Sequence, residues 1–139
     1  MSGPVVIAVV NHKGGCGKTT TAVNLGAALA MGNEEYGIKP HKILMIDLDP
    51  KGNIATTFGV DKKSLGATMN ELFKAGIDGP EVKIEECIIG PKQLSKSMKE
   101  AFVRQNPERK RGPPKGLEID NLWLLPADLD LAGIEIDLA

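Results

Sequence analysis

The sequence predicts an α/β domain built on a parallel sheet. Residues Val5–Val10 form an unbroken, β-branched apolar run, which is typical of a strand buried on both faces of such a sheet. A glycine-rich turn, a helical pattern and a second apolar run, Lys42–Asp47, follow in that order. Strand, helix and strand in such close succession predict a βαβ unit with a right-handed crossover. The length of 139 residues and a hydrophobic content of 42% suit one globular domain, residues 1–139.

The other elements are predicted from spacing and turn residues. Apolar residues recur on one helical face between Lys18 and Met31, and Gly32 marks the expected end of that helix. The weaker patterns further along predict a helix at Leu65–Ala75, a strand at Val82–Ile89, a loop at Gly90–Gly116, a strand at Leu122–Leu125 and a helix at Leu129–Ala139.

Composition excludes several classes of protein. Seventeen basic residues oppose 18 acidic ones, which excludes a globally basic nucleic-acid coat but leaves room for a local basic patch. Two cysteines, Cys16 and Cys87, cannot build a disulfide scaffold and fit a reducing cytoplasm, where we expect the protein. No apolar stretch approaches the ~20 residues of a membrane span, and the short first apolar run does not read as a signal peptide.

A glycine-rich loop joins the first predicted strand to the first predicted helix. Its residues are Lys13, Gly14, Gly15, Cys16, Gly17, Lys18, Thr19 and Thr20. Glycines let successive N–H groups face phosphate oxygens, and the start of a helix adds unpaired N–H groups and a positive dipole end. Lys18 is expected to contact the outer phosphates, and the Thr19 hydroxyl is expected to bind Mg²⁺.

The match to the general phosphate-binding loop is imperfect. His12 stands where that pattern has its first glycine. The alternative is a glycine-rich turn that only caps a helix, but the strand before the loop and the helix after it favour a phosphate site. Cys16 is expected to be a small filler in the loop rather than a redox thiol.

A second motif follows the second predicted strand and reads Asp47-Leu48-Asp49-Pro50-Lys51-Gly52-Asn53. Ligand groups gather beyond the carboxyl ends of parallel strands, so these carboxylates should lie on the side of the phosphate loop. One acid can hold the water shell of a metal, and the other can orient an attacking water. The alternative is that Asp47 and Asp49 only cap a turn before Pro50.

The two motifs together resemble a known family. The segment from Lys13 to Thr20 resembles the deviant Walker A box of the ParA/MinD family of P-loop ATPases. The segment from Asp47 to Asn53 resembles the next motif of the ParA (Soj) branch, which partitions plasmids and chromosomes. Leu125–Ala127 and Asp130–Gly133 also resemble a later ParA segment.

The resemblance implies a fold, a ligand and residue roles. The family fold is a twisted, mostly parallel sheet with flanking helices, and its members bind ATP and Mg²⁺ in a nucleotide sandwich dimer. The resemblance implies that Lys13 contacts the phosphates bound by the partner subunit, that Lys18 contacts the phosphates of its own subunit, and that Thr19 binds the metal. Asp47 is expected near the metal, and Asp49 is expected to position the hydrolytic water.

The sequence also departs from the family. Cys16 replaces a usual valine, and Lys51 replaces a usual glutamine and adds charge near the site. The family's Walker B strand, which lies between the strands that carry the two motifs, is expected beyond Ala139, so the fold is expected to be incomplete. The first two strands would then either pair directly or leave a gap, and the absence of that strand counts against stability and hydrolysis of the isolated chain.

The predicted loop insert at residues 90–116 is rich in positive charge. Its basic residues are Lys92, Lys96, Lys99, Arg104, Arg109, Lys110, Arg111 and Lys115. A nonspecific DNA contact through phosphates is one interpretation. A solvated surface segment is the other and the more usual outcome for such a run.

The function predicted from these motifs is hydrolysis of ATP in a dimerisation cycle that partitions DNA or positions another cargo. Catalysis would depend on Lys13, Lys18 and Asp49. The expected partners are a second copy of the chain in a homodimer, DNA and a ParB-like stimulating protein, and no membrane span is expected. The main alternative is a short nucleotide-binding or dimerisation module without turnover. A reductase related to the nitrogenase iron protein and an amidating synthetase are further alternatives, which the isolated cysteines and the acidic motif respectively disfavour.

Overall fold

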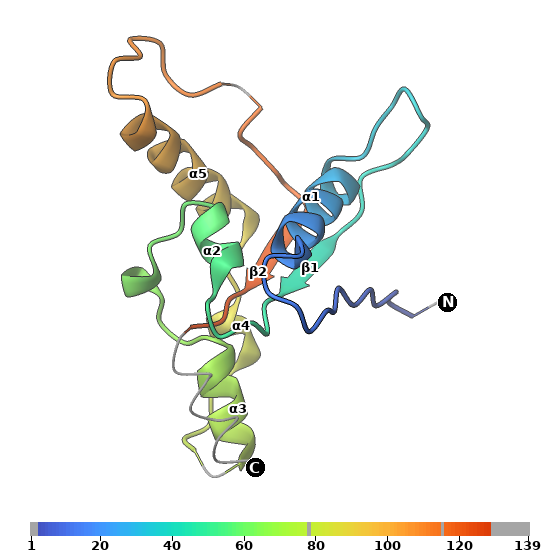
Figure 1. Ribbon diagram of the computed structural model, residues 1–139, viewed down its shortest axis with the longest axis vertical. Helices are drawn as coiled ribbons and strands as arrows, with labels where there is room; N and C mark the ends of the chain where they lie inside the picture. Colours follow the sequence, from blue (N-terminus) through green and yellow to red (C-terminus); the bar gives the residue numbers. More distant parts are fainter. Residues whose placement is uncertain (1–2, 78, 115, 129–139) are drawn as a thin grey trace.

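The computed structural model describes residues 3–77, 79–114 and 116–128 (Figure 1). In these ranges the chain forms five α-helices, one 3-10 turn and two strands. They are α1 (Lys18–Met31), β1 (Ile43–Ile46), α2 (Asn53–Thr57), η1 (Lys62–Ser64), α3 (Met69–Ile77), α4 (Ile84–Cys87), α5 (Pro91–Gln105) and β2 (Leu122–Leu125). None of the helices in the described ranges is both long and apolar enough to cross a membrane.

Strands β1 and β2 form a parallel pair at the centre of the fold. Ile43 lies beside Leu122, and Ile46 lies beside Leu125. Helix α1 packs against both strands, and α5 packs against β2 (Figure 1). The core is apolar and includes Leu122 and Leu124, neither of which has any exposed surface. The predicted α/β class with a parallel sheet and flanking helices is confirmed, and the strands predicted at Lys42–Asp47 and Leu122–Leu125 are present.

Helix α1 runs opposite to the two strands, and its bounds agree with the sequence prediction. The backbone N–H of His41, just before β1, donates to the carbonyl oxygen of Leu29 at 2.9 Å. The side-chain amide of Asn121, just before β2, donates to the carbonyl oxygen of Ala30 at 3.3 Å. Because the end of α1 lies where both strands begin, its first residue lies toward the carboxyl ends of the strands.

The apolar run Val5–Val10 is not a strand. Val5 and Val6 are 86% and 88% exposed, and the segment leads away from the two strands as the dark blue trace toward the N label in Figure 1. A strand needs a neighbour for its backbone hydrogen bonds, and in the described residues the sheet contains only β1 and β2. The predicted βαβ unit is therefore wrong for its first strand, which neither pairs directly with β1 nor joins the sheet.

One of the strands predicted in the middle of the chain is not present as predicted. The segment predicted as a strand at Val82–Ile89 contains helix α4, because Glu85 and Glu86 break the apolar run. Only Ile89 takes part in the sheet, through a pair of backbone hydrogen bonds to Leu124 of 2.8 and 3.0 Å.

Helix α3 begins four residues later than predicted because Thr68 caps it. The Thr68 hydroxyl donates to Oε2 of Glu71 at 2.7 Å, and its backbone N–H donates to the same oxygen at 2.7 Å. Both bonds run from Thr68 to Glu71, and the Thr68 hydroxyl oxygen in turn accepts the backbone N–H of Asn70 at 3.2 Å, so Thr68 caps the first turn of the helix. The hydroxyl also lies 2.9 Å from Oδ2 of Asp128, and the N–H of Met69 donates to the carbonyl of Pro126 at 2.9 Å. The start of α3 is thereby tied to the end of β2.

The loop predicted at Gly90–Gly116 is largely wrong, because its first part is helix α5. Pro91 opens the helix, a position where its missing N–H costs nothing. Leu94 is 1% exposed, and Met98 packs on the same core. These apolar residues at helical spacing anchor a segment whose charges suggested a loop. The helix predicted at Leu129–Ala139 lies outside the described residues.

Candidate nucleotide site

The glycine-rich loop turns sharply into α1. Gly15 and Gly17 have φ values of 71° and 87°, a left-handed conformation that residues with a Cβ rarely adopt. Gly17 is the N-cap residue of α1 and has no side chain with which to bond the helix start. The loop from Lys13 to Cys16 is exposed, so a ligand can reach its backbone.

The start of α1 presents free backbone donors. The first hydrogen bond of the helix runs from the N–H of Thr21 to the carbonyl of Gly17, at 2.8 Å. The N–H groups of Lys18, Thr19 and Thr20 therefore have no partner one turn back along the helix. Three such donors at the positive end of a helix dipole favour an anion.

The two lysines of the loop are linked through the backbone. Nζ of Lys18 donates to the carbonyl oxygen of Lys13 at 3.2 Å. The N–H of Lys13 donates to Oδ1 of Asn11 at 2.8 Å. Asn11 was not among the predicted site residues, although asparagine at the start of a turn commonly bonds the backbone two residues on.

Asp47 lies at the carboxyl end of β1 and is only 4% exposed. Its Oδ1 accepts the N–H of Asp49 at 3.0 Å, and its Oδ2 accepts the N–H of Ile54 at 3.2 Å. Burial raises the pKa of Asp47 above its ordinary value, and the negative charge of Asp49 raises it further. The hydrogen bonds from the two N–H donors and the positive charge of Lys62 lower this pKa, but by less. The carboxyl is thus a buried, well-oriented acceptor.

Asp49 bonds the turn that follows it. Its Oδ1 accepts the N–H of Lys51 at 3.0 Å, and its carbonyl accepts the N–H of Gly52 at 2.8 Å. The turn-capping role that the sequence offered as an alternative is therefore present for Asp47 and Asp49. A carboxylate has about four lone-pair sites, so capping a turn leaves acceptor capacity for a metal-bound or attacking water.

The fold brings both motifs to the same end of the sheet. Helix α1 begins toward the carboxyl ends of the strands, and Asp47 directly follows β1. Helix α1 also packs on α2, which begins at Asn53 after the acidic motif (Figure 1). Across the described ranges no three His, Cys, Asp or Glu residues gather as a metal cage. The hydroxyl of Thr19 and the carboxylate of Asp47 are oxygen donors of the kind that Mg²⁺ takes, and this ion commonly has few protein ligands together with phosphates and waters.

One residue near the acidic motif was missed from the sequence. Lys62 of η1 is half-buried, and its Nζ donates to the carbonyl oxygen of Lys51. A lone lysine in a polar segment carries no signal in the sequence that separates it from its neighbour Lys63. The contact becomes visible only when the fold places η1 beside the motif.

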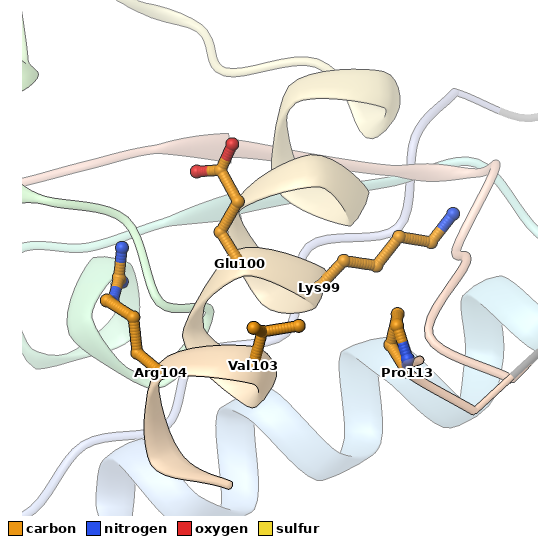
Figure 2. A pocket seen from close by; sticks show the side chains of 5 residues that line it. All are labelled: Lys99, Glu100, Val103, Arg104 and Pro113. Carbon is orange, nitrogen blue, oxygen red and sulfur yellow. The ribbon is translucent and has the colours of Figure 1, made fainter. Parts of the chain in front are cut away.

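An open hollow lies away from these residues, along α5 (Figure 2). It measures about 420 Å³ and is lined by Lys99, Glu100, Val103, Arg104 and Pro113. Lys99 forms an ion pair with Glu118 and holds the pKa of that carboxyl below its ordinary value. None of the predicted nucleotide-site residues lines this hollow, which belongs to the basic segment.

Comparison with known proteins identifies the family of the chain. Residues 5–139 match the AAA domain family, and the chain belongs to that family. It is 33% identical over 133 residues to the chromosome partitioning protein ParA of Caulobacter vibrioides, covering 96% of this chain and 36% of that protein. It is 29% identical over 133 residues to the sporulation initiation inhibitor protein Soj of Bacillus subtilis, covering 96% of this chain and 38% of that protein. The resemblance to the ParA/Soj branch is confirmed, and the chain spans little more than a third of these relatives.

Solved structures support the P-loop fold. The chain superimposes on the cobyrinic acid a,c-diamide synthase of Mycobacterium smegmatis with bound ATP analogue and magnesium, with a TM-score of 0.57 and 27% identity. The match covers 93% of this chain and 37% of the synthase. The form of that enzyme with ADP and magnesium gives the same values. The described chain is thus part of a P-loop domain.

Proposed function

We propose that this chain is the nucleotide-binding part of a ParA-like ATPase that works in the cytoplasm through a dimerisation cycle. The observation that carries the proposal is that α1 and the acidic motif lie at one end of the parallel sheet, with the free N–H groups of α1 beside the glycine loop. Similarity to ParA and Soj supports the reaction, and the synthase structures with bound nucleotide and magnesium support the ligand.

The proposed site has residues for phosphate binding, for metal binding and for orienting the attacking water. Lys18 and the amides from Gly14 to Thr20 bind the phosphates of ATP. Thr19 and Asp47 hold Mg²⁺, which when bound neutralises charge on the phosphates. Asp49 orients a water that attacks the γ-phosphorus in line. The bond from that phosphorus to the bridging oxygen breaks, and ADP and phosphate leave.

Lys13 gives the reaction its dependence on assembly. Its side chain is exposed, and the family resemblance assigns it to the phosphates of a second subunit. A positive charge that arrives only when two subunits meet stabilises the transition state only in the dimer. Hydrolysis then ends the dimeric state, which is how such a cycle moves DNA or another cargo, with a ParB-like protein as stimulator.

The test is phosphate release with Mg-ATP, run beside nucleotide binding and sedimentation. We expect binding, ATP-dependent dimers and slow turnover that Lys13→Ala lowers. Binding without turnover by a longer form of the protein as well would favour the alternative, a nucleotide-binding or dimerisation module.

An amidating synthetase is the second candidate, because the structural match is to such an enzyme. The acidic motif favours the ParA branch, and so does the higher identity of 33% to ParA. ATP turnover that appears only with glutamine and a carboxylate acceptor would favour the synthetase.

The basic segment is a candidate for nonspecific DNA contact. Lys92, Lys96 and Lys99 follow one another at helical spacing along α5. However, Lys96 pairs with Glu100, and Lys99 pairs with Glu118, which lowers the net charge offered to phosphates. DNA affinity that falls steeply with salt and is lost in Lys92→Ala/Arg104→Ala would support the contact. A solvated surface predicts no measurable affinity.

A further inference from the structure

The acidic loop, residues 47–53, is held from outside by Lys62. The ammonium group of this lysine donates to the carbonyl oxygen of Lys51. Its side chain also lies close to Gly52, since a Cβ built on that glycine would be 3.4 Å from Cε of Lys62. Lys62 belongs to η1, which is separated from the loop by the whole of α2.

The peptide unit between Lys51 and Gly52 is bound at both of its ends. Its carbonyl accepts from Lys62, and its N–H donates to the carbonyl of Asp49 at 2.8 Å. A peptide unit is planar and rigid, so a bond at each end fixes its rotation. Removal of the Lys62 bond leaves one end of this plane without its charged donor.

The orientation of this peptide unit affects the position of the Asp49 carboxylate, because both are bonded to Lys51. The N–H of Lys51 donates to Oδ1 of Asp49 at 3.0 Å, so Lys51 bonds Asp49 while its own carbonyl is bonded by Lys62. A bond from a charged donor is stronger than one between neutral groups. The chain of contacts therefore runs from Lys62 through Lys51 to the acid that is proposed to orient water.

The other side of the loop is fixed by backbone packing. Gly52 has a φ of 57° and approaches the carbonyl of Ala127 so closely that a Cβ would overlap it. Ala127 follows β2 and is fully buried. The loop is thus held between a rigid backbone on one side and the Lys62 ammonium on the other.

We infer that Lys62 is a positioning residue for the acidic loop: it fixes the peptide unit between Lys51 and Gly52 and, through Lys51, the carboxylate of Asp49. The consequence for hydrolysis rests on the proposed function. The structural part does not, because it concerns the loop without nucleotide.

The test is amide hydrogen exchange by NMR on the full 139-residue chain without nucleotide. Lys62→Met removes the donor and keeps an apolar stem, Lys62→Arg restores a charged donor, and Lys63→Met is the matched control on an exposed neighbour. We expect Lys62→Met to speed exchange at Gly52 by about tenfold. Exchange at Ile89, whose N–H bonds Leu124 in the core, should stay within about twofold.

Recovery of slow exchange at Gly52 in Lys62→Arg, with no change in Lys63→Met, would support the inference. Unchanged exchange at Gly52 in Lys62→Met would overturn it, and so would an equal rise at Ile89, which would mean general destabilisation. Lys62→Leu, which also lacks a donor, takes the place of Lys62→Met if the latter does not fold. In a form that hydrolyses ATP, Lys62→Met should lower kcat with KM little changed. If exchange at Gly52 rises as expected but kcat does not fall, the positioning of the loop by Lys62 is supported and the proposed function is not.

Discussion

The ammonium nitrogen of Lys18 lies 3.2 Å from the backbone carbonyl oxygen of Lys13. This bond closes the glycine loop on itself and holds the charge of Lys18 beside the free N–H groups at the start of α1. A lysine held by a neutral carbonyl can exchange that acceptor for a phosphate oxygen, which forms the stronger, charge-assisted bond. The loop is thus shaped before a ligand arrives.

Lys18→Ala should weaken ATP binding by about a hundredfold. The change removes a charged donor to phosphate, which is worth about 1.5–3 kcal/mol, or roughly ten- to a hundredfold in affinity. It also removes the bond that closes the loop, so the total loss should reach the upper end of that range. Calorimetric titration with Mg-ATP measures the effect, with the exposed residue Lys42 changed to alanine as control. Unchanged affinity in Lys18→Ala would remove this residue from the site.

Asp49→Ala should keep ATP binding and lower turnover by about 10²–10⁴-fold in any form of the protein that hydrolyses ATP. The carboxylate is half-buried and fixed by the N–H of Lys51, which suits a group that orients water. Phosphate release and nucleotide affinity are measured together. Normal hydrolysis would exclude Asp49 from the mechanism.

Glu71→Gln should destabilise the fold near neutral pH by about 0.5–2 kcal/mol, the usual worth of a helix cap. Burial, the largest single influence, raises the pKa of Glu71, but hydrogen bonds from Thr68, from the N–H of Glu71 itself and from Asn70 together bring the pKa below the ordinary 4.5. A lowered carboxyl pKa gives stability that is present above the unfolded-state value and lost as the pH falls through the folded-state value.

The difference in stability between the natural chain and Glu71→Gln should therefore shrink as the pH falls below about 4.5. Urea unfolding at neutral pH and at about pH 3 measures it, with the exposed Glu81→Gln as control. A difference that grows toward acid pH would contradict the capping role.

Leu94→Ala should cost about 2–5 kcal/mol of stability, the usual range for a buried leucine. Leu94 is 1% exposed on the inner side of α5, whereas Val103 of the same helix is 53% exposed. Val103→Ala is therefore the matched control and should cost little. Chemical denaturation compares the two. Equal effects would mean that α5 is not anchored in the core.

The sequence was informative where local pattern and tertiary contact agree. Helix α1 and strand β1 could be predicted from their local apolar patterns, although the side chains that they bury, such as Ala30 and Met45, are only part of those patterns and Leu44 stays 45% exposed. Helix α5 could not, since its many charges obscured the anchoring pair of Leu94 and Met98. The run at Val5–Val10 is apolar and β-branched, but the strand predicted from it is not present. A strand depends on a neighbouring strand for its hydrogen bonds, and the local sequence does not show whether that neighbour exists.

The candidate site shows the same division. The glycine loop and the acidic motif are contiguous, so their residues could be found by spacing alone. The side chain of Asn11 supports the glycine loop through Lys13, and the side chain of Lys62 supports the acidic motif through Lys51. No spacing rule finds the Lys62 contact. The buried bonds of Asp47 to Asp49 and Ile54 likewise emerge only from the folded loop.

The most direct test of the central claim is an NMR titration of the ¹⁵N-labelled chain with Mg-ATP. We expect saturable shifts concentrated in the amides of Gly14, Gly15, Gly17 and Lys18, with smaller shifts at Asp49 and Gly52. The amides along α5 should stay in place. Saturating Mg-ATP that leaves the glycine loop unmoved, or that shifts α5 instead, would contradict the claim that this loop binds the phosphates.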